Sequence, residues 1–366
     1  MEYIAILGRR EEPTDGVQDY CNYLKDALAR DGINLTAIQV RWAELGWKAS
    51  RRELLKAIEG KQSTCFLLQY TALGWSRRGF ALPAVGILKL LKKNGARCAI
   101  VFHDPDGYAG DRVVDRFRRR VQEYAMKQLA RLSDLVIFTL PREKILWLPK
   151  ETANFAFIPV GANLPAPERA WEGKREAASS KPVVAVFSLS PEPLRTKEVK
   201  LIAEAAKYAA QNVGPLEVLV IGRYSESGGE ELRRQLSSSA AEVKVLGLIS
   251  ADDVVNALQS SDVMLFVRGP ISSRRGSALA GIACGLPVVA QNGLEVTPQI
   301  TEAGVVLVPE RSTDEFGPAL VRVLTDPAYR ASLAQRSRDA QSRYFSWSVI
   351  ARQYAQALRT LDAPRE

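Results

Sequence analysis

Residues 263–290 read VMLFVRGPISSRRGSALAGIACGLPVVA and have the most informative pattern of the chain. An apolar run is followed by a polar loop, a helix-length stretch of small residues, Gly285-Leu286-Pro287 and a second apolar run. Short apolar runs bounded by turn residues are typical of strands buried on both faces, and a helix is the usual connection between parallel strands. The stretch therefore predicts a β-α-β unit of a parallel sheet.

The same alternation of apolar runs and helix-length segments extends over the whole chain. It falls into two series, because the stretch NLPAPERAWEGKREAASSKP between them has no apolar periodicity. We therefore expect an α/β protein with two Rossmann-like domains, each a doubly wound parallel sheet. The expected strands are residues 3–7, 34–40, 65–69, 98–102, 135–139 and 156–159 in the first series, and 183–187, 217–221, 243–246, 263–267, 288–290 and 305–308 in the second.

These series set the expected domain boundaries. We expect the N-terminal domain over residues 1–165, an exposed linker over 166–181 and the C-terminal domain over 182–345. An amphipathic helix is expected within residues 346–366, after an aromatic start. Doubly wound sheets bind ligands at the carboxyl ends of their strands, so two such domains imply a central cleft lined by strand-to-helix loops.

Composition narrows the class of protein. The chain has 366 residues, of which 46% are hydrophobic, enough for two buried cores. No run approaches the ~18 apolar residues of a membrane span, and the N-terminus MEYIAILGRREE does not resemble a signal peptide. We expect a cytoplasmic protein. Its four cysteines have no metal-ligand spacing and are expected to be reduced and structural.

Positive charge is concentrated in the first half of the chain. The net charge is +9, and residues 1–165 hold 26 Lys+Arg against 18 Asp+Glu. This asymmetry predicts an anionic partner, either membrane phospholipid or a phosphorylated acceptor, while nucleic acid is disfavoured because no nucleic-acid-binding motif accompanies the charge. The densest patch, Arg116, Arg118, Arg119 and Arg120, is either a solvated helix face or a surface that contacts the inner face of a membrane.

The small-residue helix carries a family resemblance. Residues 280–289, AGIACGLPVV, resemble glycosyltransferase family 4, in which this segment reads roughly E-A-M-A-C-G-x-P-V-V. The upstream stretch VLGLISADDVVNALQSSDVMLFV and the terminal FSWSVIARQYAQAL resemble further segments of that family. The resemblance implies the GT-B fold, in which a C-terminal helix crosses back onto the N-terminal domain.

The resemblance also implies an activity. It implies transfer of a sugar from a nucleotide-diphosphate sugar, the co-substrate, to an acceptor that the sequence does not identify: a polysaccharide, a lipid-linked glycan or a small molecule. It further implies retention at the anomeric carbon. Basic side chains and a helix N-terminus would stabilise the leaving diphosphate, so we expect neither a metal nor a resident cofactor.

Several residues are candidates for the diphosphate site. Arg274, Arg275, Gly276 and Ser277 bring guanidinium and backbone N–H groups to the start of a helix, where the macrodipole favours an anion. The alternative is a capped helix with two solvated arginines. The resemblance adds Arg195 or Lys197, which follow the first strand of the second domain, and Gly16 in the first domain.

The resemblance also gives candidate residues for the sugar and the base. His103 follows a buried strand at its carboxyl end, where the family has a His-Asp pair, although a single histidine is often only structural. Leu246, Gly247 and Leu248 match the loop that contacts the nucleobase.

One departure from the family bears on activity. Family members carry two glutamates eight positions apart, one near the donor sugar and one on the ribose, and this chain has Ser272 and Ala280 there. Ser272 still offers a hydroxyl to the sugar, whereas Ala280 offers no polar group. Two readings stay open: a subgroup with rearranged donor contacts, or an inactive homologue that acts as a binding or scaffold subunit in glycan assembly.

Overall fold

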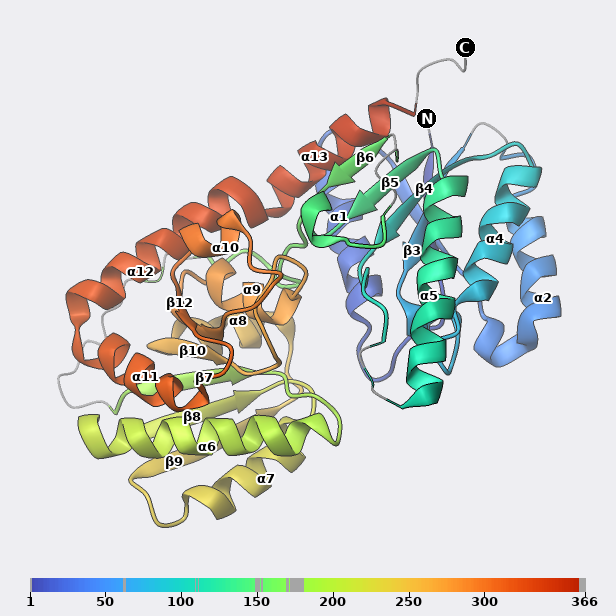
Figure 1. Cartoon of the computed structure of the whole chain (residues 1–366). Helices are drawn as coiled ribbons and strands as arrows, with labels where there is room; N and C mark the ends of the chain where they lie inside the picture. The colour runs from blue at the N-terminus through green and yellow to red at the C-terminus, as the bar shows by residue number, and fades with distance from the viewer. Residues whose placement is uncertain are drawn as a thin grey trace. The chain divides into compact units, whose positions relative to one another are not determined.

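The protein folds into two compact units. The structure is a computed structural model that describes residues 2–61, 64–108, 110, 112–148, 152, 154–168, 171 and 181–361 (Figure 1). One unit comprises Met1–Val160 with Trp347–Glu366, and the other comprises Gly161–Ser346. Most of the expected linker lies outside the described residues.

The first unit is built on a six-stranded sheet of order β2-β1-β3-β4-β5-β6, in which all paired strands are parallel. Every strand expected from the sequence is present, because each apolar run is long enough to cross the buried sheet. The strands are β1 Tyr3–Leu7, β2 Leu35–Gln39, β3 Cys65–Tyr70, β4 Arg97–Phe102, β5 Leu135–Phe138 and β6 Phe155–Phe157.

Helices cover this sheet, and α4 and α5 pack side by side along it (Figure 1). The helices are α1 Gly16–Ala29, α2 Trp42–Ala57, α3 Ala72–Trp75, α4 Leu82–Lys93, α5 Val113–Leu132 and the C-terminal α13 Trp347–Arg359, with a 3-10 turn η1 at Arg142–Lys144. The core between the layers is aromatic and aliphatic: Phe102 stacks on Phe138 with ring centroids 4.7 Å apart, and both side chains are fully buried.

The C-terminal helix packs on α1, which confirms the expected return of the chain to the first unit. The hydroxyl groups of Tyr20 and Tyr354 are joined by a buried hydrogen bond of 2.9 Å. Trp347 stacks on Tyr23 with centroids 5.5 Å apart. Aromatic packing with a polar contact between two phenols therefore fixes this helix against α1.

The second unit is built on a second six-stranded sheet, of order β12-β11-β10-β7-β8-β9, again with parallel pairs throughout. All six expected strands are present. Its elements are β7 Val183–Phe187, α6 Leu194–Val213, β8 Leu216–Ile221, α7 Ser225–Leu236, β9 Ala241–Gly247, α8 Ala251–Gln259, β10 Val263–Phe266, α9 Gly276–Ala283, β11 Val288–Gln291, α10 Pro298–Glu302, β12 Val305–Val308, η2 Thr313–Glu315, α11 Phe316–Thr325, α12 Pro327–Ala340 and η3 Gln341–Phe345.

The small residues of α9 allow this helix to lie close to the sheet. A Cβ atom at Gly281 would lie 2.8 Å from Val288 and 3.0 Å from Met264. Both neighbours are fully buried strand residues, so a larger side chain at this position would force the helix away from β10 and β11. The quoted β-α-β stretch thus folds as its sequence predicts.

Trp171 corrects the expectation of a wholly exposed linker. Its side chain is buried, and its indole N–H donates to the carbonyl of Ser261 at 3.0 Å. Arg338 of α12 donates to the carbonyl of Trp171 at 3.0 Å. A large aromatic side chain with a satisfied polar group favours burial even inside a stretch rich in charged residues.

The sequence predicts that the cysteines are reduced and structural. All four cysteines are buried and form no disulfide, and burial raises the pKa of the Cys21 and Cys284 thiols to about 12. The expectation that all four cysteines are reduced and structural is therefore confirmed. Across the part of the chain that the structure describes, no helix combines the length and apolarity that crossing a bilayer requires.

Candidate functional site

In the second unit, three neighbouring strands end at one edge of the sheet and bring their loops together. β7 lies between β10 and β8, so the segments that follow them are adjacent. Ser188 has φ of 62° and its N–H donates to the carbonyl of Ile221, while the N–H of Leu189 donates to the carbonyl of Arg223. Left-handed backbone at a strand end frequently marks a functional loop, and here hydrogen bonds hold it in place.

A buried carboxylate fixes the loop between β7 and α6. Glu198 lies on the first turns of α6 and is 6% exposed, and its Oε2 accepts a hydrogen bond of 2.7 Å from the N–H of Ser190. A carboxylate that accepts a backbone N–H makes a strong, charge-assisted bond. The loop after β7 is therefore held in one position relative to α6.

Arg268 connects this loop with the start of α9. Its Nε lies 3.4 Å from the hydroxyl of Ser190, and its Nη1 lies 3.4 Å from the hydroxyl of Ser277. The guanidinium is half-buried at the carboxyl end of β10. We did not predict Arg268 from the sequence, although a basic residue that directly follows a buried strand is a signal for this edge.

The two basic candidates on α6 differ in their surroundings. Arg195 pairs with Glu192 at 2.9 Å, and its guanidinium carbon lies 5.9 Å from the centre of the Tyr224 ring. Lys197 is exposed, and no carboxylate of the described residues pairs with it. An incoming phosphate would therefore compete with Glu192 at Arg195 but meets no such competitor at Lys197.

Arg274 is held in an ion pair. Its Nε and Nη2 donate to the two carboxylate oxygens of Glu295 at 2.8 and 2.6 Å, and the two side chains are only 12% and 23% exposed. Such a bidentate pair fixes the loop before α9 to the segment after β11. Arg274 thus already holds a carboxylate, and its contact with a diphosphate stays a prediction.

The positions of the two absent glutamates are both fully buried. Ser272 and Ala280 have no exposed surface, and the hydroxyl of Ser272 has no hydrogen-bond partner among the described residues. A buried hydroxyl without a partner is costly, which makes Ser272 notable. Its contact with a donor sugar stays a prediction.

The start of α9 is open on its loop side. Arg275 precedes the helix and donates its N–H to the carbonyl of Ser272 at 3.1 Å. A Cβ atom at Gly276 would have only the Gly161 carbonyl within 4 Å, at an ordinary 3.7 Å. The first N–H groups of a helix lack intrahelical partners. The arrangement of Arg275, Gly276 and Ser277 can therefore receive an anion.

The candidate base-contacting loop lies at the same edge of the sheet. Gly247 ends β9 with φ of 71°, and its carbonyl accepts a hydrogen bond of 2.7 Å from the N–H of Gly222, beyond β8. Leu246 is half-buried, and Leu248 is 51% exposed. The loop is fixed by its backbone and presents an apolar side chain.

In the first unit, His103 lies at the carboxyl end of β4 and contacts a buried glutamine. Its Nε2 lies 2.7 Å from Oε1 of Gln69, which is 2% exposed. Burial lowers the pKa of His103 to about 4, although Asp15 acts in the opposite direction. The imidazole is therefore neutral at pH 7. Because an amide oxygen only accepts, Nε2 carries the proton and Nδ1 is left as an acceptor.

The start of α1 carries a carboxylate beside Gly16. Asp15 caps the helix, and its Oδ1 accepts from the N–H groups of Val17 and Gln18 at 2.9 and 3.0 Å. Those donors are occupied, and the negative charge disfavours a phosphate. The Asp15 cap therefore disfavours a diphosphate contact at Gly16, and that contact stays a prediction.

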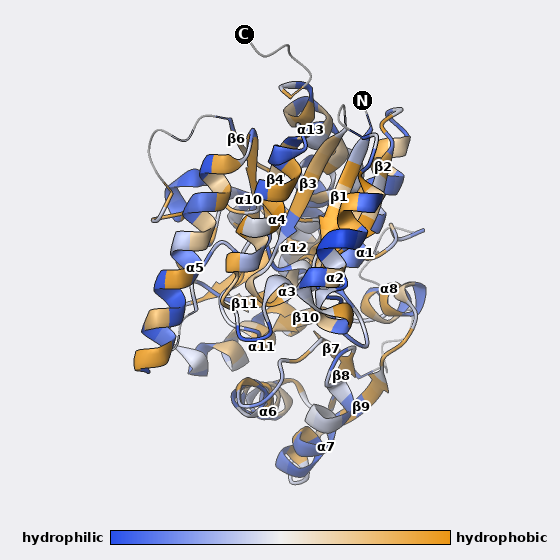
Figure 2. Cartoon of the chain, turned by 90° about the vertical axis from the view of Figure 1, so that its right-hand side faces the viewer, coloured by the Kyte–Doolittle hydropathy of each residue, from blue (hydrophilic) through white to orange (hydrophobic). Residues whose placement is uncertain are grey.

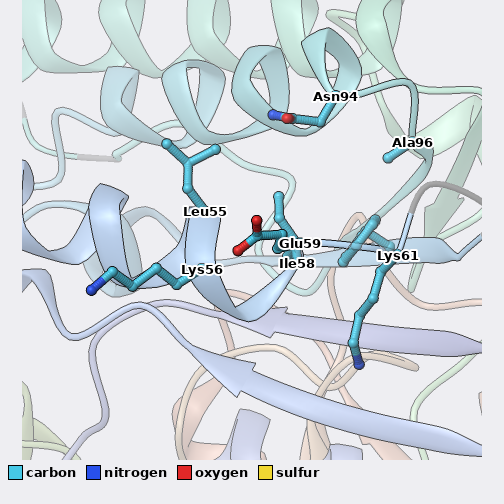
Figure 3. A pocket seen from close by; sticks show the side chains of 8 residues that line it. Leu55, Lys56, Ile58, Glu59, Lys61, Asn94 and Ala96 are labelled. Atoms are coloured by element: carbon cyan, nitrogen blue, oxygen red, sulfur yellow. The ribbon is translucent and has the colours of Figure 1, made fainter.

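A cavity of about 320 Å³ lies elsewhere in the first unit, close to the amino-terminal ends of β3 and β4 (Figure 3). It is lined by Leu55, Lys56, Ile58, Glu59, Lys61, Phe66, Asn94 and Ala96. Since His103 follows the carboxyl end of β4, this cavity lies at the opposite edge of the sheet. Within the described residues, no cluster of His, Cys, Asp and Glu is arranged to hold a metal ion.

Comparisons with known proteins point to one family. The family model of glycosyl transferases group 1 matches residues 181–326. The chain is 24% identical over 224 residues to a GDP-mannose-dependent monoacylated alpha-(1-6)-phosphatidylinositol monomannoside mannosyltransferase of Corynebacterium glutamicum, covering 57% of this chain and 56% of that protein. It is 34% identical over 197 residues to a D-inositol 3-phosphate glycosyltransferase of Saccharomonospora viridis, covering 49% and 44%. The chain thus spans about half the length of the curated relatives it matches.

Solved structures resemble nearly the whole chain. Sucrose-phosphate synthase of Thermosynechococcus elongatus superimposes with a TM-score of 0.70 at 18% identity, covering 99% of both chains. Anabaena HepE in complex with UDP and glucose superimposes with a TM-score of 0.65 at 15% identity, covering 98% of this chain and 100% of HepE. These likenesses establish the GT-B fold. The chain thus has the GT-B fold, and its residues 181–326 match the family of glycosyl transferases group 1.

Proposed function

We propose that the protein transfers a sugar from a nucleoside-diphosphate-sugar donor, and that the donor diphosphate binds at the carboxyl edge of the second unit's sheet. The observation that carries the proposal is the position of Arg268, within 3.4 Å of hydroxyls on both the loop after β7 and the start of α9. Guanidinium, hydroxyl and helix N-terminal N–H groups together suit a diphosphate.

Basic groups at this edge would supply the charge that the reaction needs. Negative charge accumulates on the leaving diphosphate as the bond to the sugar breaks, and fixed positive groups stabilise it without reorganisation. Arg268 and Arg275 lie beside the start of α9, and Lys197 is an exposed ammonium on α6. We propose that these residues act in place of a metal ion, and that the reaction proceeds with retention at the anomeric carbon.

His103 is assigned a role as hydrogen-bond acceptor. Its Nε2 proton is committed to Gln69 at 2.7 Å, so Nδ1 is the free acceptor of a neutral ring. In this role His103 would orient a hydroxyl of the transferred sugar or of the acceptor. It would not carry a positive charge at pH 7, because Nδ1 is not protonated there. Gln69 is a positioning residue, because it determines which nitrogen accepts.

The acceptor class follows from charge and from the relatives. The names of two relatives specify inositol 3-phosphate and a phosphatidylinositol mannoside, both of which carry phosphate. The first unit holds most of the chain's positive charge. We propose a phosphorylated or lipid-linked glycan acceptor, as in polysaccharide or glycolipid assembly, with the protein in the cytoplasm where nucleotide sugars are available.

A transfer assay tests this function. The full chain is incubated with UDP- or GDP-sugars and with inositol phosphate or phosphatidylinositol, and the released nucleoside diphosphate is measured. We expect release with at least one donor, insensitivity to EDTA, and a loss of more than tenfold in Arg268→Ala but not in Arg233→Ala, an exposed arginine of α7. Equal rates in both variants would argue against the proposed diphosphate site.

A second function is favoured by one observation. Ser272 and Ala280 stand where family members carry glutamates, and both are fully buried. An inactive homologue that binds a nucleoside diphosphate, or none, and serves as a subunit in glycan assembly fits those positions. Thermal-shift measurements with UDP and GDP separate a protein that binds a nucleoside diphosphate from one that has lost this binding. A ligand at a hundred times its dissociation constant stabilises the folded protein by about 2.7 kcal/mol. Binding without turnover would favour the subunit.

A further inference from the structure

Helix α5 exposes large apolar side chains that the fold leaves uncovered. Val113, Val114, Phe117 and Tyr124 are 74%, 50%, 60% and 57% exposed. Val113, Phe117 and Tyr124 follow one another at spacings of four and seven residues, which puts them on one face of the helix. Figure 2 shows the first turn of α5 as an orange end followed by blue turns. Single exposed apolar residues are ordinary, but a group on one helix face marks an interaction site.

Basic residues interleave with this apolar face. Arg120, Lys127 and Arg131 continue the spacing of three and four residues from Phe117, and Arg116 flanks it. The helix carries six basic residues and two acidic ones. No carboxylate of the described residues lies within ion-pair distance of Arg116 or Arg120. Their positive charge is thus available to a partner.

Neither acidic residue of α5 offsets this charge on the exposed face. Asp115 is buried and pairs with Arg118 at 3.4 Å, so both charges of that pair are turned to the protein. Glu123 is half-buried and lies on the same side of the helix as Arg116, but among the described residues it forms no ion pair with Arg116 or Arg120. The exposed face is therefore apolar and cationic, and we call the surface formed by Val113, Arg116, Phe117, Arg120 and Tyr124 the α5 face.

The protein holds the α5 face rigidly in place. Gln122 accepts from the N–H of Tyr108 at 2.6 Å and donates to the carbonyl of Gly79 at 2.9 Å. Arg119 donates to the carbonyl of Tyr108 at 2.8 Å, and the Arg118 guanidinium lies 4.4 Å from the Tyr108 ring centre. These contacts tie the first turns of α5 to the neighbouring loops. Exposure of the apolar residues is thus a property of the fold and not of a loose helix end.

We propose that the α5 face docks on the surface of a bilayer that contains anionic phospholipid. Apolar side chains of an interfacial helix enter the boundary between headgroups and acyl chains, while neighbouring arginines contact lipid phosphates. The pattern of Phe117 and Tyr124 between Arg116 and Arg120 fits that geometry. It does not fit a second copy of the chain, because apposed α5 faces would bring like charges together.

Docking of the α5 face on a bilayer does not depend on the sugar-transfer reaction. Attachment to a bilayer would bring the first unit, which carries most of the positive charge, to a surface where lipid-linked acceptors are concentrated. Binding to lipid can be measured without any sugar nucleotide, so failure of one proposal is distinguishable from failure of the other.

The test is co-sedimentation of the full chain with vesicles at low salt. We compare vesicles of phosphatidylcholine alone with vesicles of phosphatidylcholine and phosphatidylglycerol, using the wild type, Phe117→Ser, and the double variant Arg116→Gln/Arg120→Gln. The double variant keeps folding intact because both side chains are exposed and lie outside the core. The matched control is Arg51→Gln/Arg52→Gln, which removes the same charge from exposed positions of α2.

We expect the wild type to bind anionic vesicles and not neutral ones. High salt should weaken the binding to anionic vesicles. Each arginine should contribute about fivefold to the partition coefficient, so the double variant loses more than tenfold while the control changes less than the α5 variants. Three results would overturn the inference. One is a wild type that does not sediment with anionic vesicles, and another is an equal loss of vesicle binding in the control and the double variant. The third is a concentration-dependent dimer that the α5 variants abolish.

Discussion

Nε2 of His103 lies 2.7 Å from Oε1 of Gln69, and this pair determines the state of the chain's single histidine. Gln69 belongs to β3, and His103 directly follows β4. Tyr70 of β3 is opposite Phe102 of β4, so Gln69 precedes this pair and His103 follows it. An amide oxygen cannot donate, which fixes the proton on Nε2. The tautomer therefore follows from this contact, whereas the neutral state of the ring follows from its burial.

Replacement of Gln69 with glutamate should reverse this state. A carboxylate beside the imidazole favours the charged form, so the pKa of His103 should rise from about 4 toward or above 6.5 in Gln69→Glu. Nuclear magnetic resonance reads the change directly, since one histidine gives one set of ring signals. A wild-type pKa near 6.5 would mean that the ring is not held as described.

The lowered pKa of His103 also makes stability depend on pH. The folded-state value of about 4 lies below the ordinary 6.5, so between these values the unfolded chain binds more protons. The free energy of unfolding should therefore fall as the pH is lowered through this window, by roughly 1.4 kcal/mol per pH unit at most, and His103 should have no effect above pH 6.5. Urea denaturation of the wild type and of His103→Gln at several pH values isolates the contribution of His103 to the free energy of unfolding. Parallel pH profiles would contradict the expectation.

Much of the fold is predictable from the sequence because burial leaves a direct pattern. The run VVAVF of β7 and the run VMLF of β10 are apolar throughout, as strands covered on both faces must be. The close packing of Gly281 likewise follows from the small residues of α9. Apolar strands and small-residue helices can each be recognised from one continuous segment of the sequence.

Contacts between side chains that are far apart along the chain could not be predicted from the sequence. Arg268 and Ser190 are 78 positions apart, Arg274 and Glu295 are 21 apart, and each pair meets only because of the strand order. Spacing along the chain carries no signal for such contacts. The burial of Trp171 was missed for a related reason, because its partner Ser261 belongs to a distant segment.

The ion pair between Arg274 and Glu295 gives a prediction about stability. Arg274→Ala removes the guanidinium from a largely buried carboxylate, and should lower the free energy of unfolding by about 1–3 kcal/mol. The second substitution Glu295→Gln, made in the same protein, should recover part of the loss because the largely buried negative charge is gone. Melting temperatures of the single and double variants measure this. A double variant less stable than Arg274→Ala would contradict the prediction.

Two basic residues are predicted to affect turnover without affecting the fold. Arg275→Ala and Lys197→Ala should each lower turnover by more than tenfold, because each removes a positive group from the departing diphosphate. Lys197 is exposed and Arg275 is half-buried outside the core, so the melting temperature should change little. Steady-state kinetics with the donor identified in the transfer assay provides the measurement. Near-normal turnover in both variants would remove them from the diphosphate site.

The central claim is that the carboxyl edge of the second unit binds a nucleoside diphosphate, and calorimetric titration with UDP and GDP tests it most directly. The wild type should bind one of the two, and Arg268→Ala should weaken that binding by more than tenfold while Arg233→Ala leaves it unchanged. Absence of binding by either nucleotide, or equal affinity in wild type and Arg268→Ala, would contradict the claim.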